Sequence, residues 1–207
     1  FLYLGYQLFG AAIGLLAGVS TGFIFIWFSI KDRILGKREA LKEIKPLFKY
    51  SLPVFAQSIA LTSMISTDLI LVKHFFSPEI AGGYAAISKF GTIAFFVSSP
   101  ITQVMFPLIA RKHSHGEAYH RIFFFSLSAI VAISSIIVLT YLFFGNSIVN
   151  VLTSGKYIEH SYLLWRLGFY MLLLGVAIVL TQFYLSIGKT KIVVFFVLAA
   201  LLQVLLI

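Results

Sequence analysis

The chain alternates between long apolar runs and short polar segments. Many of the apolar runs approach or exceed about 20 residues, which is longer than the core-facing stretch of a soluble helix requires. A run such as residues 51–72 would be ~33 Å long as a helix, enough to cross a ~30 Å hydrocarbon core. This pattern predicts an all-α, polytopic membrane helix bundle with about six transmembrane helices. The predicted spans are residues 1–30, 51–72, 84–110, 122–144, 162–187 and 192–207.

The composition agrees with this interpretation. Hydrophobic residues make up 60% of the 207 residues and charged residues only 11%, and the mean hydropathy is +1.00. The formal net charge of +9 could indicate a nucleic-acid partner. However, Lys and Arg concentrate in the loops, as membrane topology requires, so we predict no such partner. The chain has no cysteine, which excludes disulfides and thiolate metal sites.

The loops differ strongly in their content of Lys and Arg. From residue 31 onward, successive loops contain seven, one, three, one and two such residues. Because cytoplasmic loops carry the excess of positive charge, loops 31–50, 111–121 and 188–191 are predicted to be cytoplasmic. The protein is therefore expected to be a multi-pass protein of the cytoplasmic (inner) membrane. No basic segment precedes residues 1–30, so this run is predicted to be a span and not a signal peptide.

Two charged residues lie inside the two membrane spans of the predicted hairpin of residues 51–110. Asp68 is in its first span and Lys89 in its second, and a charge at the centre of a span costs ~2.5–3.5 kcal/mol, so such residues are usually functional. Counted from span ends at Val72 and Tyr84, both lie ~6–8 Å inside the same membrane face. They could neutralise each other inside the membrane. The alternative is an interfacial pair whose lysine extends toward water.

Other polar residues extend this picture to two layers. Three charged residues lie in the outer third of their spans, and three glutamines lie in the inner third of theirs. A shared polar cavity running across the membrane would account for both layers. Unrelated hydrogen bonds between helices would also account for the glutamines. The charged residues are Asp68, Lys89 and Arg166, and the glutamines are Gln57, Gln103 and Gln182.

Local signals refine the helix boundaries. Ser77, Pro78 and Glu79 have the form of an N-cap, a first-turn proline and an acid favoured by the helix dipole, so the third helix is predicted to begin at Pro78. Pro100 lies deep in the same helix and is predicted to kink it.

Glycines recur every four residues in the first span and predict close helix packing, within the molecule or across a dimer seam. The histidine-rich loop 111–121 lacks a recognised ligand spacing, so no metal site is predicted.

Six segments between residues 45 and 191 occur in the order and spacing of a known transporter family. They are Lys45-Pro46, SLP at 51–53, STDLILVKHFFSPEIAGGYAAISK at 66–89, MFP at 105–107, VLTSGKYIEHSYLLWRLG at 151–168 and LSIGKTK at 185–191. With these segments the chain resembles the Wzx-type flippases, the polysaccharide-biosynthesis branch of the multidrug/oligosaccharidyl-lipid/polysaccharide exporter superfamily.

The resemblance implies a MATE-like fold, in which two lobes of six helices enclose a central cavity. On that basis the chain is expected to be an internal fragment. Residues 1–30 would be the last helix of the first lobe, 31–50 a basic linker between the lobes, and 51–207 a truncated second lobe. The implied function is to flip a polyprenyl-pyrophosphate-linked oligosaccharide across the membrane by alternating access, for O-antigen or exopolysaccharide export. Polysaccharide polymerases are the implied partners, and no cofactor is expected.

For such a substrate, the pyrophosphate calls for cations. Lys89 and Arg166 are the candidates inside the membrane, and Lys73 is the candidate at its mouth. Asp68 could pair with Lys89 in one state, or carry a coupling proton or Na⁺. The remaining substrate-binding candidates are Gln57, Gln103 and Gln182. The aromatic residues that could stack on sugars, or form an interfacial belt instead, are Tyr84, Tyr162, Trp165 and Tyr170.

Two other functions are weighed against this one. A drug or small-cation exporter of the same superfamily would share the fold but should favour buried acids over buried cations. A membrane-embedded glycan ligase or acyltransferase would need a paired base and acid or nucleophile on an outer loop. The outer loops show no such constellation, so the protein is predicted not to be an enzyme. The acid or base candidates in these loops are His74, Glu79, Glu159 and His160.

Overall fold

The computed structural model describes residues 7–35 and 45–206. The chain divides into two compact units, residues 1–44 and 45–207. The first unit has one described helix, α1 (Gln7–Leu35), which runs past the end of the predicted first span. Of the predicted linker of residues 31–50, residues 31–35 belong to α1 and residues 45–50 to α2, and the division into two lobes and a linker stays a prediction. Residues 36–44 lie outside the described residues, and the helix packing predicted from the glycines of the first span stays a prediction.

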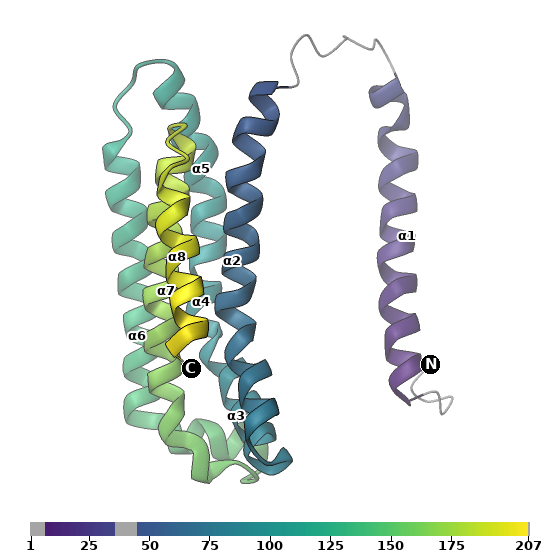
Figure 1. Cartoon of the computed structure of the whole chain (residues 1–207), viewed down its shortest axis with the longest axis vertical. Helices are drawn as coiled ribbons and strands as arrows, with labels where there is room; N and C mark the ends of the chain where they lie inside the picture. Colours follow the sequence, from purple (N-terminus) through teal and green to yellow (C-terminus); the bar gives the residue numbers. More distant parts are fainter. Residues whose placement is uncertain (1–6, 36–44, 207) are drawn as a thin grey trace. The chain divides into compact units, whose positions relative to one another are not determined.

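The second unit is a bundle of helices joined by short connections (Figure 1). Its long hairpins place apolar helices side by side, and its described residues contain no strand. The elements are α2 (Lys45–Phe75), α3 (Pro78–Gly91), α4 (Ile93–Phe96), α5 (Ser98–Ser114), α6 (His120–Thr153), the 3-10 helix η2 (Ile158–Leu163), α7 (Leu164–Ser186) and α8 (Ile192–Leu206).

The predicted fold class is confirmed. Five helical segments within the described residues are long and apolar enough to cross a membrane, and α8 adds a shorter apolar helix. The protein is therefore an all-α, multi-pass membrane protein. The five segments are Ala12–Ile30, Phe48–Phe75, Pro78–Ser114, His120–Thr153 and Ile158–Ser186.

Helix α7 organises the second unit. It packs against α3, α4, α5, α6 and α8, and buries Met171, Leu174 and Val179. Two glycines of α7 permit this packing, because a Cβ atom at Gly168 would lie 2.8 Å from the Tyr141 ring and one at Gly175 would lie 3.4 Å from Ser98. Small residues allow helices to approach closely where apolar burial alone gives no driving force in lipid.

The connections of the second unit alternate between its two ends (Figure 1). The start of α2, the α5–α6 loop and the α7–α8 turn lie at one end. The α2–α3 turn and η2 lie at the opposite end. This first end contains two of the loops predicted to be cytoplasmic, 111–121 and 188–191, and residues 45–50 of the third, so the antiparallel arrangement of the second unit agrees with the predicted topology.

The start of α3 also agrees with the prediction. Ser77 has an extended backbone, Pro78 is the first helical residue and Glu79 lies in the first turn, although the Ser77 side chain makes no capping hydrogen bond. One turn further, α3 packs closely on the η2 region. A Cβ atom at Gly83 would lie 3.1 Å from the ring of His160, so any larger residue there would require His160 to shift.

The third membrane-spanning segment is not one regular helix. Its helix is interrupted at Thr92 and Val97, which separates α3, α4 and α5. The second interruption follows Phe96, which lies four residues before Pro100. A proline ring clashes with the carbonyl four residues before it and offers that carbonyl no N–H donor, so Pro100 disrupts the helix at Phe96. The distortion predicted from Pro100 is therefore present. At the first interruption the Thr92 hydroxyl donates to the Lys89 carbonyl at 2.7 Å, a local bond that competes with regular helix.

Hydroxyl groups of α6 bond to backbone carbonyls beside both interruptions. The Tyr141 hydroxyl donates to the Phe90 carbonyl at 2.7 Å, and the Ser134 hydroxyl donates to the Ala94 carbonyl at 3.0 Å. The two donors lie seven residues apart on one face of α6. Because an unsatisfied backbone group costs several kcal/mol in lipid, neighbouring side chains of this kind allow a broken helix to persist inside a membrane.

Candidate functional site

The candidate site is a buried polar cluster centred on Asp68 of α2. The Asp68 side chain is only 7% exposed, and the Tyr84 hydroxyl of α3 donates a 2.6 Å hydrogen bond to its Oδ2 atom. Helices α2 and α3 form a tight hairpin, and both residues lie eight positions from Phe76 at its turn. The hairpin therefore places the tyrosine directly against the carboxylate.

The other oxygen of this carboxylate is left without a hydrogen-bond partner. Oδ1 of Asp68 is buried, and no donor of the described residues reaches it. An unsatisfied buried polar atom costs about 1–3 kcal/mol, and more for a charged group. Such an atom in a native protein calls for an explanation, such as an ordered water, a bound ion or a functional role. Asp68 is therefore the strongest candidate for a functional group inside the membrane.

Two further side chains complete the cluster. The Tyr170 hydroxyl of α7 hydrogen-bonds with the Met64 carbonyl at 2.8 Å and with Oε1 of Gln203 at 3.2 Å. The Gln203 amide of α8 also donates to the Met64 carbonyl at 3.4 Å. Tyr170 lies close enough to Asp68 for the two to interact electrostatically. The cluster thus joins α2, α3, α7 and α8 through polar contacts among otherwise apolar helices.

The candidate cations do not join this cluster. Lys73, Lys89 and Arg166 are all exposed. Within residues 7–35 and 45–206, the one ion pair is between Lys112 and Glu117, so Asp68 and Lys89 are not paired in this structure. The predicted matched depth was counted from span ends at Val72 and Tyr84, although the helix itself begins at Pro78. With the observed turn, Lys89 lies ~7.5 Å further along α3 than Tyr84, the residue that faces Asp68.

Arg166 packs instead on aromatic side chains. Its guanidinium carbon lies 5.4 Å from the centre of the Tyr162 ring and 5.3 Å from that of the Trp165 ring. Both distances are within the range of cation–π attraction. The three residues form a cationic and aromatic group where η2 meets α7, in which Tyr162 and Arg166 are exposed and Trp165 is half-buried.

The three glutamines are divided between two environments. Gln103 and Gln182 line one pocket of about 320 Å³, together with Tyr50 of α2. The Gln103 amide also donates to the Ser99 hydroxyl at 2.9 Å within its own helix. Gln57 is buried in α2, with 3% of its surface exposed, and is not among the residues that line this pocket. A common cavity joining these amides to the charged layer stays a prediction.

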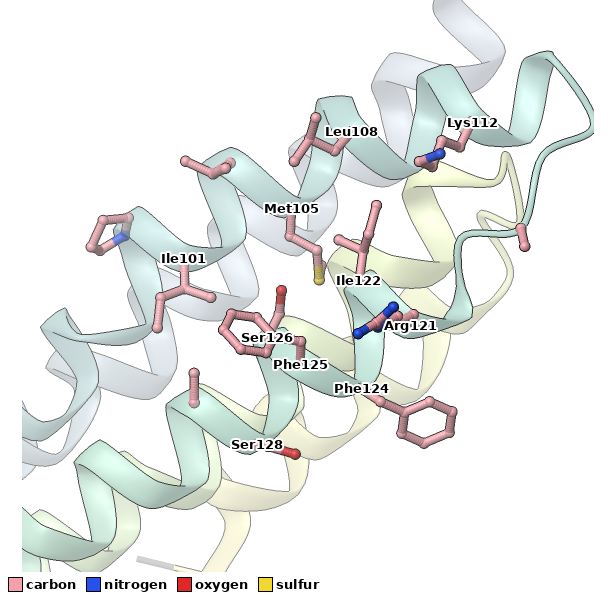
Figure 2. Close-up of a pocket in the computed structure, with 14 residues that line it drawn as sticks. Ile101, Met105, Leu108, Lys112, Arg121, Ile122, Phe124, Phe125, Ser126 and Ser128 are labelled. Atoms are coloured by element: carbon pink, nitrogen blue, oxygen red, sulfur yellow. The ribbon is translucent and has the colours of Figure 1, made fainter.

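A larger groove lies between α5 and α6 (Figure 2). It has a volume of about 1080 Å³, and its walls are mostly apolar. Lys112 and Arg121 line one end of it, beside the loop that connects the two helices. Lys112 also holds Glu117 of this loop at 2.6 Å, and this hydrogen bond, together with the positive charge, lowers the pKa of the Glu117 carboxyl below its ordinary value. Sequence patterns did not predict this groove.

Sequence reasoning also missed the role of the tyrosines in the Asp68 cluster and overlooked Gln203. Tyr84 and Tyr170 were interpreted as sugar-stacking or interfacial residues. The signal for Tyr84 was present in the chain, because the proline-marked start of α3 fixes the hairpin turn and hence the residue opposite Asp68. No comparable signal could identify Tyr170 and Gln203, since they lie on helices that are distant in sequence.

The sequence was compared with models of known protein families, with curated proteins and with solved structures. A family model described as "Polysaccharide biosynthesis protein" matches residues 2–162, which is most of the chain. No curated protein and no solved structure gives a significant match. The match agrees with the resemblance noted in the segments between residues 45 and 191. The chain therefore belongs to the polysaccharide biosynthesis protein family, with a role in polysaccharide synthesis or export.

Proposed function

We propose that the protein flips a polyprenyl-pyrophosphate-linked oligosaccharide across the cytoplasmic membrane by alternating access. Family membership and the membrane-spanning helices support transport of a polysaccharide precursor. Sugars and a pyrophosphate cannot cross hydrocarbon unaided, so their passage needs a polar path through the protein while the lipid tail stays in the bilayer. The proposal concerns the whole protein to which this chain contributes its helices.

The observation that carries the proposal is the buried, half-satisfied carboxylate of Asp68. A carboxylate in the membrane that receives one hydrogen bond from the described residues, from Tyr84, has an oxygen left over that could bind a proton or a cation. We assign to Asp68 the role of carrying the coupling H⁺ or Na⁺. Because its cluster joins four helices, a change in its charge would alter the contacts among all of them.

The interrupted segment α3–α4–α5 supports a movement of this kind. In many secondary transporters, discontinuous helices form the substrate and ion sites, and rocking of one bundle against another gives alternating access. Here the interruptions at Thr92 and Val97 lie between the Asp68 cluster and the opposite end of the bundle. A bend at these positions would let α5 move while α3 stays packed on α7.

The exposed cations keep a role in substrate binding in this proposal. Lys89 and Arg166 would attract the pyrophosphate inside the membrane, and Lys73 would do so at the mouth. The pocket that contains Gln103 and Gln182 would supply hydrogen bonds to a sugar. The side chains of Lys89 and Arg166 are exposed in the second unit and form no ion pair within residues 45–206.

A drug or small-cation exporter of the same superfamily is the second candidate. It is favoured by one specific observation: Asp68 is a buried acid that forms no ion pair with any described residue, as a cation-binding site would require. A membrane-embedded ligase or acyltransferase is less well supported, since His160, one of its few outer-loop candidates, is packed against Gly83. Transport is also the simplest use of a polar cluster enclosed by membrane-spanning helices.

The experiment that separates these functions uses the complete protein in a strain that needs it for surface polysaccharide. Lys89→Ala, Arg166→Ala and Asp68→Asn are introduced separately, membrane levels are checked, and the lipid-linked precursor is quantified in each leaflet. We expect the precursor to accumulate in the inner leaflet in all three variants. Normal export by both cation variants would remove those residues from the substrate site, and normal export by Asp68→Asn would remove the coupling role.

A further inference from the structure

We infer that the groove between α5 and α6 is a binding site for an anionic phospholipid, with the headgroup phosphate between Lys112 and Arg121. This inference goes beyond the transport function and does not depend on it. The acyl chains would lie along the apolar walls, on residues such as Val104, Leu108 and Phe125. Four features of the groove support this assignment: its shape, its charge, its length and its position in the membrane.

The shape of the groove follows from the antiparallel pairing of α5 and α6. Five residues, 115–119, separate the two helices, so the helices are held apart at this end (Figure 2). The space between them is about 1080 Å³, which is at the upper end of the range for ligand pockets. The side chains that line it come from both helices, and Figure 2 shows Met105 and Ile122 on facing walls.

Charge is confined to one end of the groove. Lys112 and Arg121 are the charged residues that line it, and both lie next to the connecting loop (Figure 2). Glu117 accepts one hydrogen bond from the Lys112 ammonium, which leaves further donors on that group. Arg121 is exposed and forms no ion pair within the described part of the second unit. A phosphate between these two side chains would accept charge-assisted hydrogen bonds from both.

The length of the groove matches one leaflet of a bilayer. Its wall on α5 runs from Pro100 to Lys112, which is ~18 Å along a helix, and half of a ~30 Å hydrocarbon core is ~15 Å. Beyond the two cations, the polar side chains that line it are the hydroxyls of Ser126 and Ser128. Its walls therefore fit acyl chains that extend from one membrane surface to the bilayer midplane.

The position of the charged end selects an anionic headgroup. This end carries the loop predicted to be cytoplasmic, and the cytoplasmic leaflet is rich in anionic lipid. Basic pockets between transmembrane helices on that side bind anionic lipid headgroups. Any apolar helix face is covered by lipid, so the specific content of the inference is a preference for the headgroup charge at this one groove.

The test measures lipid preference directly. The purified protein is exposed to phosphatidylglycerol and phosphatidylcholine with identical acyl chains, and the bound lipid is counted by native mass spectrometry. The double variant Lys112→Gln/Arg121→Gln should lose its preference for phosphatidylglycerol by roughly tenfold or more. Arg111→Gln is the matched control, since Arg111 is an exposed cation next to Lys112 that does not line the groove. It should retain the preference.

A second variant fills the groove and leaves its charges in place. Val104 lines the groove and is 62% exposed, so Val104→Trp should block the acyl chains without disturbing the core. We expect it to lower phosphatidylglycerol binding while helicity and monodispersity stay unchanged. An unchanged preference in the double variant, or an equal loss in Arg111→Gln, would overturn the inference. Displacement of phosphatidylglycerol by a lower concentration of polyprenyl phosphate would assign the groove to the substrate lipid instead, and so would also overturn it.

Discussion

The Tyr84 hydroxyl donates a 2.6 Å hydrogen bond to Oδ2 of Asp68, across the hairpin that joins α2 and α3. Among the described residues, the Tyr84 hydroxyl is the one donor that reaches the carboxylate, since Oδ1 has no hydrogen-bond partner. In a membrane-spanning helix the bond stabilises a charge or a dipole that lipid would otherwise disfavour. The pair therefore ties α2 to α3 near the turn of the hairpin.

Loss of the Tyr84 hydroxyl should destabilise the protein by about 1–3 kcal/mol, because Tyr84→Phe leaves a buried carboxylate without a donor. Replacing both Tyr84 and Asp68 should lower the free energy of unfolding by less than the sum of the two single replacements, since the double variant leaves no polar atom of the pair unsatisfied. We would measure thermal unfolding in detergent for Tyr84→Phe, Asp68→Leu and the double variant. Additive effects would show that the two side chains are not coupled.

The hydroxyls of α6 beside the helix interruptions should each contribute measurably. Ser134→Ala and Tyr141→Phe remove the donors to the Ala94 and Phe90 carbonyls, and we expect each to cost about 1–2 kcal/mol. Hydrogen exchange should rise in residues 90–98. Thr140→Ala is the control, because its exposed hydroxyl bonds within its own helix to Ile136. Equal effects at all three positions would argue against a specific role for these donors.

Helix α7 should not tolerate a methyl group at Gly168. A Cβ atom there would lie 2.8 Å from the Tyr141 ring, which is held in place by its bond to the Phe90 carbonyl. We expect Gly168→Ala to destabilise the protein by about 1–3 kcal/mol through overpacking. At Gly82 the nearest atom is 3.7 Å away, so Gly82→Ala should be neutral or slightly stabilising. Thermal unfolding of the two variants gives the comparison, and a tolerated Gly168→Ala would contradict the packing described here.

The Lys112–Glu117 pair should show a pH dependence of defined sign. Its hydrogen bond lowers the folded-state pKa of Glu117 from the ordinary value of 4.5. The stabilising contribution of the pair is therefore fully present above pH 4.5 and is lost as the pH falls through the lowered pKa of Glu117. Comparing the protein with Glu117→Gln between pH 7 and pH 3 should show a small difference that disappears at the acid end. A difference that grows with acidification would reverse the assigned sign. The effect should also weaken with added salt, since the pair is exposed.

Much of the architecture was predictable from the chain alone. The lengths of the apolar runs, the excess of Lys and Arg in alternate loops, and the signals at Pro78 and Pro100 indicated the helices, their antiparallel order and the distorted third segment. They could do so because a bilayer sets the length of a spanning helix and requires the backbone to satisfy its own hydrogen bonds. Proline acts locally on the backbone and needs no tertiary context.

The tertiary structure decided which polar side chains meet. It gave Asp68 the hydroxyl of Tyr84 as its partner and left Lys89 exposed, because the turn at residues 76–77 sets the register of the hairpin. It brought Tyr170 and Gln203 together at the Met64 carbonyl and placed Lys112 and Arg121 at one end of a groove. These contacts depend on the rotation and separation of helices distant in sequence. Hydropathy determines that a helix crosses the membrane, whereas packing determines which way each side chain faces.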